Sequence, residues 1–262
     1  MTYQLALFGD PVKHSLSPQI HQGFAQQFGF DIDYQLIQVS AAELRSRIND
    51  FFNSGGHGAN ITVPHKQAAL AVTDQLTERA QQAAVVNTLF IKDGQLWGDN
   101  TDGAGLVNDF KQKQIQTHNQ RILILGAGGA VKGILPALLA TKPEHIRIYN
   151  RTIEKARQLA ARSGNCDVLI KDDTTHAFDV LINGTSLGHH GQSPPLHPEW
   201  IKPHTIVYDL SYGEAAQPFL KKAMQLGDTK TFAGLGMLHH QAALAFERWF
   251  NRMPKITLPN NN

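Results

Sequence analysis

The stretch "RILILGAGGAVKGILPALLA", residues 121–140, decides the fold. It opens with an apolar run typical of a buried strand, passes through a cluster of glycines, and ends in an apolar run long enough for a helix. Gly126 permits a tight turn, and Gly128 and Gly129 let backbone N–H groups approach a phosphate at the positive end of the helix dipole. The third glycine of the usual G-x-G-x-x-G pattern is replaced by Val131. Strand, glycine turn and helix together still predict a dinucleotide-binding βαβ unit.

The next predicted strand, "IRIYNRT" at residues 146–152, indicates which dinucleotide binds. An NAD site usually ends this strand in Asp or Glu, which accepts a hydrogen bond from the ribose 2′-hydroxyl. Here the strand ends in Asn150, Arg151 and Thr152, with Lys155 one turn further on. These groups suit a dianionic 2′-phosphate and favour NADP over NAD. The alternative is a solvated helix start with Thr152 as N-cap.

Strand-like and helix-like segments also alternate before this unit. The predicted elements are a strand at 3–9, a helix at 17–29, a strand at 34–39, a helix opening with the capping box Ser40–Glu43, and a strand at 58–62. The first helix has Ser17 as N-cap, Pro18 at its first position and Gly29 as its stop. Another helix is expected to begin at Lys66. The order β-α-β-α-β is typical of a parallel sheet with crossover helices.

The remaining segments complete a prediction of two domains. Asp93-Gly94, between two apolar runs, predicts a β-hairpin. The later elements are strands at 121–125, 145–149, 167–170, 178–182, 205–209 and near 229–232, followed by an amphipathic helix at 238–250. We therefore expect an α/β fold with two α/β domains around a cleft, the second a Rossmann-type, doubly wound parallel sheet. The predicted domains are 1–101 plus 238–262 for substrate binding and catalysis, and 102–237 for NADP binding.

Composition narrows the classes of function. Of the 262 residues, 42% are hydrophobic and 18% charged, as in globular proteins. The net charge of +2 is mild and the basic residues are scattered, which argues against a nucleic-acid partner. The chain contains no membrane-length apolar stretch, no basic leader and only one cysteine, Cys166, so we expect a cytoplasmic protein without an internal disulfide. A small-molecule substrate is the expected partner, and a homodimer is one option for assembly.

Lys66 and Asp102 are the candidates for chemistry. No HExxH or CxxC pattern occurs and the 13 histidines are dispersed, so no metal site is expected. Lys66, in "NITVPHK" (60–66), follows a strand end, and Asp102, in "GDNTDG" (98–103), lies in the connection between the domains. Both are expected to face the interdomain cleft, where an Asp holds a Lys ammonium in place for proton transfer. From these residues alone, a solvated surface position is the alternative for each.

Seven motifs make the chain resemble the shikimate dehydrogenases over essentially its whole length. They are "SLSP" (15–18), "NITVPHK" (60–66), "AVNT" (85–88), "DNTDG" (99–103), "GAGGA" (126–130), "NRT" (150–152) and "GLGMLHHQAA" (234–243). The resemblance is to the bacterial type that carries no fused dehydratase domain. It implies the reversible, NADPH-dependent reduction of 3-dehydroshikimate to shikimate in chorismate and aromatic amino-acid synthesis.

The resemblance also implies roles on the substrate side. Lys66 would stabilise and protonate the developing alkoxide, and Asp102 would orient Lys66; the motif leaves open whether Lys66 carries the proton or mainly stabilises charge. The implied substrate-binding residues are Ser15, Ser17, Thr62, Lys66, Asn87, Asp102, Tyr212 and Gln241. Ser15, Ser17 and Tyr212 would bind the carboxylate. From the residues alone, Ser17 as a helix cap and Asn87 as a turn residue stay open, and Asn60 is assigned to a structural turn.

On the cofactor side, the resemblance implies binding of NADP(H). The implied cofactor residues are Gly126, Ala127, Gly128, Gly129 and Ala130 for the pyrophosphate, Asn150, Arg151, Thr152 and Lys155 for the 2′-phosphate, Thr185, Leu210, Gly234 and Met237 for the nicotinamide half, and Glu78. The loops "GTSLGHHG" (184–191) and "YDLSYGEAAQPF" (208–219) depart from the family pattern. Two alternatives stay open: an NAD-preferring quinate/shikimate dehydrogenase, against which Ser15, Arg151 and Thr152 argue, and a redox-sensing regulator without turnover, which needs no acid/base residue.

Overall fold

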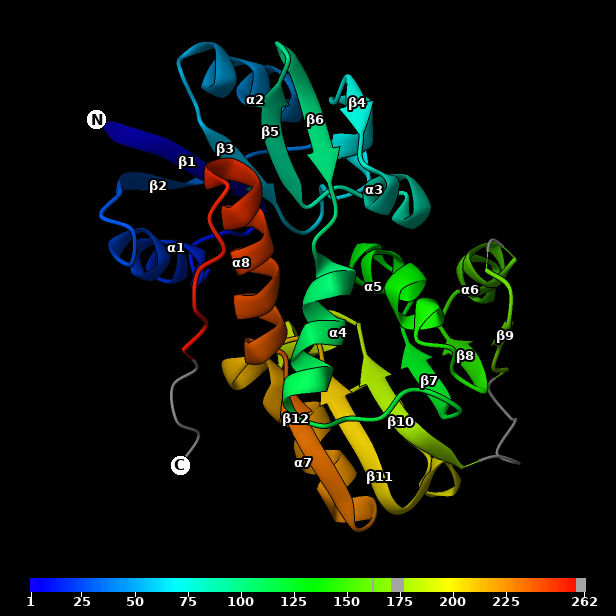
Figure 1. Cartoon of the computed structure of the whole chain (residues 1–262). Coiled ribbons are helices and arrows are strands. Elements are labelled where there is room, and N and C mark those ends of the chain that lie inside the picture. The colour runs from blue at the N-terminus through cyan, green and yellow to red at the C-terminus, as the bar shows by residue number, and fades with distance from the viewer. Residues whose placement is uncertain (162, 171–176, 258–262) are drawn as a thin grey trace. The chain divides into compact units, whose positions relative to one another are not determined.

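The structure, a computed structural model, describes residues 1–161, 163–170 and 177–257 (Figure 1). The chain divides into two compact units: Met1–Gly105 with His239–Asn262, and Leu106–Leu238. The division falls within helix α4 (Asp102–Gln112) and again within helix α8 (Leu235–Phe250). Among the described residues, no helix combines the length and the apolar character that crossing a bilayer requires.

The first unit is built on a mixed sheet with the strand order β2-β1-β3-β5-β6-β4. Its strands are β1 (Thr2–Gly9), β2 (Asp31–Gln38), β3 (Gly58–Ile61), β4 (Gln75–Leu76), β5 (Thr88–Lys92) and β6 (Gln95–Asp99). Its helices include α1 (Ser17–Gln26), α2 (Leu44–Asn53) and α3 (Glu78–Ala83). Strand β1 runs parallel to β2 and β3, as predicted, whereas β5 pairs antiparallel with β3 and β6. The parallel arrangement therefore holds for the first three strands, and β4 again pairs parallel with β6 at the far edge of the sheet.

The turn between β5 and β6 is the hairpin that the sequence predicted. Asp93 and Gly94 have φ angles of 53° and 72°. Positive φ at both central residues is the signature of a type I′ turn, whose twist matches that of the flanking strands. Asp-Gly adopts this conformation at little cost, so the local sequence is sufficient to specify the hairpin.

Three predicted helix starts are wrong in detail. Helix α1 begins at Ser17 itself, and the Ser17 side chain does not cap it; instead the Ser17 N–H donates to Ser15 Oγ over 3.2 Å. Helix α2 begins only after Glu43, whose carboxylate accepts a bond from the Ser40 N–H at 3.4 Å and from the Ser40 hydroxyl. Because the Glu43 N–H donates to the Ser40 carbonyl at 3.2 Å and not to the Ser40 hydroxyl, only one half of the capping box forms. Lys66 lies in a turn that leads into a short 3₁₀ helix, Ala68–Ala71.

The C-terminal part of α8 packs on the sheet of the first unit. Trp249 Nε1 donates to the carbonyl of Leu89 at 3.0 Å. The indole also occupies the space where a side chain at position 58 would stand: a Cβ on Gly58 would lie 2.3 Å from Trp249 Nε1. Gly58 is therefore required for the helix to approach strand β3 this closely.

The second unit is a doubly wound sheet, as predicted. Its strands are β7 (Arg121–Leu125), β8 (His145–Tyr149), β9 (Cys166–Val168), β10 (Phe178–Asn183), β11 (Ile201–Asp209) and β12 (Thr229–Ala233). They pair in parallel in the order β12-β11-β10-β7-β8-β9. This is the Rossmann order, and the chain reverses its direction of winding between β7 and β10. In such sheets, ligands bind at the carboxyl ends of the strands beside that reversal.

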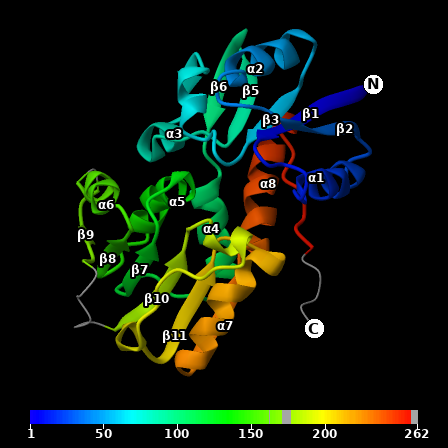
Figure 2. The same ribbon diagram turned by 180° about the vertical axis from the view of Figure 1, so that it is seen from behind.

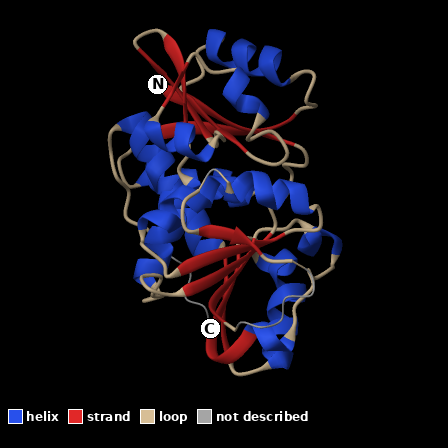
Figure 3. Ribbon diagram, turned by 90° about the vertical axis from the view of Figure 1, so that its right-hand side faces the viewer, coloured by secondary structure: helices blue, strands red, loops and turns tan. Residues whose placement is uncertain are grey.

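Both faces of this sheet are covered (Figures 2 and 3). On one face, Ile122 and Ile124 of β7 pack with residues of α4, α5 (Gly129–Ala140) and α6 (Ile153–Ala160). On the other face, Leu123 and Leu125 of β7 pack with residues of α7 (Gln217–Leu226). A strand buried on both sides needs a continuous apolar run, which explains why "RILIL" carries no alternation.

Candidate active site

Lys66 and Asp102 form an ion pair inside the first unit. Lys66 Nζ lies 2.6 Å from Asp102 Oδ2. The side chains are 14% and 4% exposed, so the pair is largely withdrawn from water while the lysine keeps a small accessible surface. Charge-assisted bonds of this length are strong, and a buried one fixes the ammonium in a single position. The sequence prediction that Asp102 holds Lys66 in place is therefore supported by the geometry.

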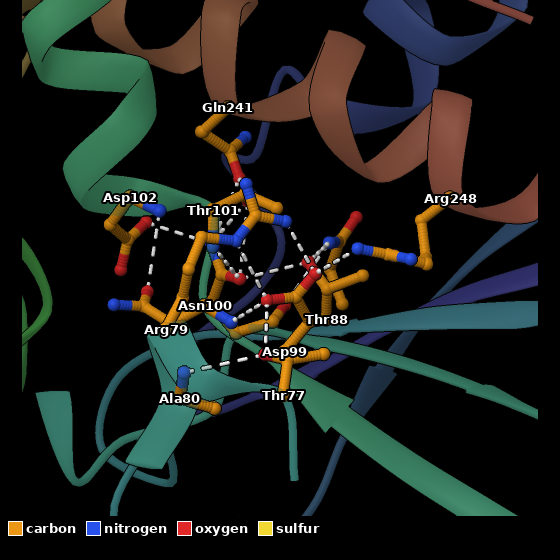
Figure 4. Close-up of polar contacts among 12 residues, drawn as sticks. Thr77, Arg79, Ala80, Thr88, Asp99, Asn100, Thr101, Asp102, Gln241 and Arg248 are labelled. Carbon is orange, nitrogen blue, oxygen red and sulfur yellow. Dashed lines mark hydrogen bonds and ion pairs between the residues drawn. The ribbon is translucent and has the colours of Figure 1, made fainter. Parts of the chain in front are cut away.

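Asn87 is the centre of the polar network around this pair, and its partners Thr101, Asp102 and Gln241 are labelled in Figure 4. Its Nδ2 donates to Asp102 Oδ1 and Thr101 Oγ1, both at 2.9 Å, and to Gln241 Oε1 at 3.2 Å. Its Oδ1 accepts from the Thr101 N–H at 2.9 Å and from the Thr88 hydroxyl at 2.8 Å. Asn87 thus holds the second oxygen of Asp102 while the first faces Lys66. A residue that only closes a turn would need none of these side-chain contacts.

Asp99 anchors the chain just before Asp102 (Figure 4). This carboxylate is fully buried and accepts bonds from Thr77 Oγ1 (2.6 Å), from Arg79 (2.5 and 3.1 Å), from Arg248 (3.2 Å) and from the Asn100 N–H (2.7 Å). Burial alone would raise the pKa of Asp99, but Arg79, Thr77 and Arg248 together outweigh burial and hold that pKa below its ordinary value. The sequence analysis missed this cluster because its members come from α3, β6 and α8.

A second polar path leads from Asn87 towards the serine pair. Asn60 Nδ2 donates to the Asn87 carbonyl at 3.1 Å, and Tyr34 Oη donates to Asn60 Oδ1 at 2.8 Å. Burial raises the pKa of Tyr34 above its ordinary value, an effect partly offset by hydrogen bonding to Ser17. Ser15 Oγ in turn donates to Ser17 Oγ at 3.1 Å. The path makes Asn60 part of the network rather than a structural turn residue only.

The sequence did not predict that Tyr34 and Asn60 belong to this network. One signal could have found Asn60: an amide in "GANI", where every neighbour is apolar or Gly, must satisfy its hydrogen bonds inside the protein. Of the other predicted substrate residues, Thr62 follows β3 and is half-buried, whereas Tyr212 belongs to the second unit.

The glycine turn after β7 leaves open space for a phosphate group. Gly126 has φ of 110°, which disfavours other residues, and its N–H donates to the Tyr149 carbonyl at 2.7 Å. Gly128 is exposed, and a Cβ placed on it would meet nothing within 4 Å. Gly129 starts α5, whose first-turn N–H groups have no partners within the helix. Ala127 and Ala130 complete the same turn.

The missing third glycine has a structural explanation. Val131 is fully buried, and a Cβ on Gly184 would lie 2.4 Å from Val131 Cγ2. In the usual pattern the third glycine allows the helix to pack closely on the strands. Here the glycine that allows this approach is on the facing strand end, at position 184.

The groups predicted for a 2′-phosphate stand at the end of β8. Arg151, Thr152 and Lys155 are exposed, and Asn150 Nδ2 donates to the Thr152 carbonyl at 2.8 Å. Thr152 takes the N-cap position of α6, as the alternative expected, although its side chain makes no capping bond. Among the described residues, neither the Arg151 nor the Lys155 side chain has a hydrogen bond or an ion pair. These donors fit an anionic group better than a ribose hydroxyl.

The residues predicted for the nicotinamide half follow β10, β11 and β12. They are Thr185, Leu210, Gly234 and Met237. Gly234 cannot be replaced without a shift, because its Cβ would lie 2.3 Å from the Leu210 carbonyl oxygen. Glu78 stands apart from this group: it begins α3 in the first unit and accepts a bond from Gln82 Nε2 at 2.9 Å. The described residues bring no three His, Cys, Asp or Glu side chains together in a group able to hold a metal ion.

Comparisons with known proteins agree along the whole chain. The profile of the shikimate dehydrogenase substrate binding domain matches residues 7–89, that of shikimate/quinate 5-dehydrogenase matches residues 109–192, and that of the shikimate 5′-dehydrogenase C-terminal domain matches residues 234–258.

Individual relatives are similar over nearly their full length. A shikimate dehydrogenase (NADP(+)) of Colwellia psychrerythraea is 42% identical over 256 residues, which cover 97% of this chain and 93% of the relative. One of Alcanivorax borkumensis is 45% identical, covering 93% and 90%. Among solved structures, shikimate 5-dehydrogenase of Thermus thermophilus in complex with NADP(H) and shikimate has a TM-score of 0.86 and 32% identity, covering 97% of this chain and 95% of that one. The chain belongs to the shikimate dehydrogenase family.

Proposed function

We propose that this chain catalyses the reversible NADPH-dependent reduction of 3-dehydroshikimate to shikimate, a step of aromatic amino-acid synthesis, with Lys66 and Asp102 as the acid/base pair. The observation that carries the proposal is the ion pair of 2.6 Å between these residues, held by Asn87 in a chain whose relatives are named shikimate dehydrogenase (NADP(+)). A cytoplasmic location and a homodimer stay predictions from the sequence.

The second unit fits NADP(H). The open space at Gly128 and the first turn of α5 would hold the pyrophosphate, and Arg151, Thr152 and Lys155 would hold the 2′-phosphate. When bound, NADP(H) supplies or accepts the hydride. The charge of Arg151 and Lys155, with no acid at the end of β8, supports NADP rather than NAD.

The protein's own contribution is to place a proton donor beside the substrate carbonyl. Lys66 has three N–H donors, and Asp102 Oδ2 takes one of them. Another N–H points to the carbonyl oxygen, where it stabilises the developing negative charge and then transfers its proton. Asp102 keeps the ammonium in this position. In the reverse direction the neutral amine accepts the hydroxyl proton, and the small exposed surface of Lys66 lets it exchange that proton with water.

The remaining polar groups hold the substrate. Ser15 and Ser17 bind the carboxylate, because hydroxyls donate well to a small anion. The role of Tyr212, which belongs to the second unit, stays a prediction from the family resemblance. Thr62, Asn87 and Gln241 contact hydroxyls or the reacting carbonyl. The network that fixes Asn87 and Gln241 in advance means that substrate binding need not order these side chains.

The test is steady-state turnover of the purified protein in a grid of shikimate or quinate against NADP⁺ or NAD⁺. Turnover confined largely to shikimate with NADP⁺ is expected. Comparable rates with quinate or NAD⁺ would overturn the assignment of substrate or cofactor. NADPH binding without turnover in any combination would contradict catalysis and point to a regulator.

A further inference from the structure

Two buried polar residues end adjacent strands of the second unit. Asn183 is the last residue of β10 and Asp209 the last of β11, and the two are partners in the strand register. Their exposed fractions are 1% and 0%. Asn183 Nδ2 donates to Asp209 Oδ2 at 2.8 Å. Polar side chains buried at the end of an apolar strand are unfavourable unless their hydrogen bonds are satisfied, so their partners show what the pair does.

The remaining polar atoms of the pair hold the loops that follow the two strands. Asn183 Oδ1 accepts two bonds from Thr185, from its N–H at 2.9 Å and from its hydroxyl at 2.8 Å. Asp209 Oδ1 accepts a bond from the Ser211 N–H at 2.8 Å. A single amide–carboxylate bond therefore ties the start of one loop to the start of the other.

Backbone hydrogen bonds connect these two loops to the residue that follows β12. The Leu210 N–H donates to the Asn183 carbonyl at 2.9 Å, and the Gly234 N–H donates to the Ser211 carbonyl at 2.8 Å. Gly234 also packs directly on the Leu210 carbonyl. Thr185, Leu210 and Gly234 are thus held relative to one another through Asn183 and Asp209, at the carboxyl ends of strands beside the reversal of the sheet.

The carboxylate at position 209 is not explained by stability. Burial raises the pKa of Asp209 to about 6, although bonds from Ser211 and Asn183 oppose the rise. A raised pKa means that the folded protein disfavours the ionised form present at neutral pH. An acid kept here despite that penalty, with both oxygens bound to loop-fixing groups, indicates a positional role.

We propose that Asn183 and Asp209 form a positioning pair that fixes the loops after β10 and β11 so that Thr185 and Leu210 receive the nicotinamide half of NADP(H). The pair acts through these two residues and does not itself touch the cofactor. The inference rests on the proposed function, since it needs NADP(H) to bind this unit.

Two substitutions remove the tie in different ways. Asp209→Asn leaves one oxygen for two donors, Asn183 Nδ2 and the Ser211 N–H. Asn183→Asp keeps an acceptor for Thr185 but removes the donor to Asp209 and sets two carboxylates face to face. Thr205→Val is the matched control: Thr205 is fully buried in the middle of β11, where its hydroxyl donates to the Phe178 carbonyl at 2.9 Å.

The experiment compares the affinity of each full-length variant for NADPH with its affinity for adenosine 2′,5′-bisphosphate, which lacks the nicotinamide half. We expect Asp209→Asn and Asn183→Asp to weaken NADPH binding about tenfold, as for the loss of one charge-assisted bond, and to change bisphosphate binding less than about twofold. Thr205→Val leaves both affinities unchanged.

Two results would overturn the positioning role. Equal weakening of both ligands would show that the pair only supports the fold of the unit, and unchanged NADPH affinity in both variants would show that it positions nothing. If the proposed function itself were wrong, the folded wild-type protein would bind neither NADPH nor the bisphosphate. Circular dichroism of each variant confirms that the compared proteins are folded.

Discussion

The surroundings of Asp102 and the carboxyl end of β8 are built in opposite ways. Around Asp102, the side chains of Lys66, Asn87 and Gln241 are buried or nearly so and already bonded to one another. At the end of β8, the side chains of Arg151 and Lys155 are exposed and, within the described residues, unpaired. The side chains of the first region are already ordered by their mutual bonds before a ligand binds. Those of the second region carry charges that a ligand must order when it binds. Substitutions in the first should therefore change rate, and those in the second affinity.

Lys66→Ala tests the first region and should have the largest effect. Loss of a placed proton donor should lower kcat by about 10²–10⁴-fold. The affinity for NADPH should stay the same, because Lys66 lies in the first unit and the proposed dinucleotide residues lie in the second. Lys92→Ala, which removes an exposed lysine of the β5–β6 hairpin, is the control. Rapid kinetics and NADPH titration measure the two quantities. Normal turnover by the Lys66 variant would refute the acid/base assignment.

Arg151→Ala tests the other side of the comparison. We expect the KM for NADP⁺ to rise about 10–100-fold and the KM for NAD⁺ to change little, since only NADP⁺ carries the 2′-phosphate. The effect should shrink at high salt because the guanidinium is exposed. Arg157→Ala, at an exposed position of the helix α6 that follows Arg151, should leave both constants unchanged. A parallel rise for both cofactors would mean that Arg151 does not read the phosphate.

His21 should make the organised region sensitive to acid. It is fully buried and stacks on Tyr34 with ring centroids 5.0 Å apart. Burial lowers the pKa of His21 to about 3, and the opposing effect of Asn60 on this pKa is smaller. Among the described residues, neither ring nitrogen of His21 has a hydrogen bond of normal geometry. The unfolded chain takes up this proton first, so His21 makes stability fall as pH drops below about 6.5.

The expected loss from His21 is about 2 kcal/mol of unfolding free energy between pH 8 and pH 5. Denaturant unfolding at both pH values measures it, and His21→Phe should remove that share of the loss. His14→Gln, at an exposed position, is the comparison variant. The prediction fails if the His21 variant keeps the full dependence on pH.

Gly128→Ala should have the smallest effect on the fold. A Cβ there meets no atom within 4 Å, and the backbone φ of −83° suits alanine, so the unfolding free energy should change by less than about 1 kcal/mol. NADPH affinity should nevertheless fall, because the added methyl group enters the space kept for the pyrophosphate. Gly164→Ala, at an equally open position after the C-terminal end of α6, should change neither the unfolding free energy nor the NADPH affinity. Undiminished NADPH binding would place the phosphate elsewhere.

The sequence predicted features that depend on local contacts, but not those that depend on contacts between distant segments. The glycine turn, the β5–β6 hairpin and the strands of the second unit depend on residues close in sequence, and all three are confirmed. The candidate pair Lys66 and Asp102 came from strand ends and the family resemblance. The contacts of Asp99 and of Asn183 with Asp209 join segments that no local pattern connects, so they required the fold. Cap predictions at Ser17 and Ser40 failed because α1 begins at Ser17 itself and because the Glu43 N–H donates to the Ser40 carbonyl.

The burial of Cys166 has a practical consequence. Burial raises its pKa to about 12, so at pH 8 only about one molecule in 10⁴ carries the thiolate that reacts with labels. Since it is the only cysteine in the chain, a new one would be labelled almost alone. Gln95→Cys, at an exposed position beside the tip of the hairpin, would attach a fluorophore to the first unit away from Lys66 and Asp102. The protein is thus suited to single-site spectroscopy without first removing a native thiol.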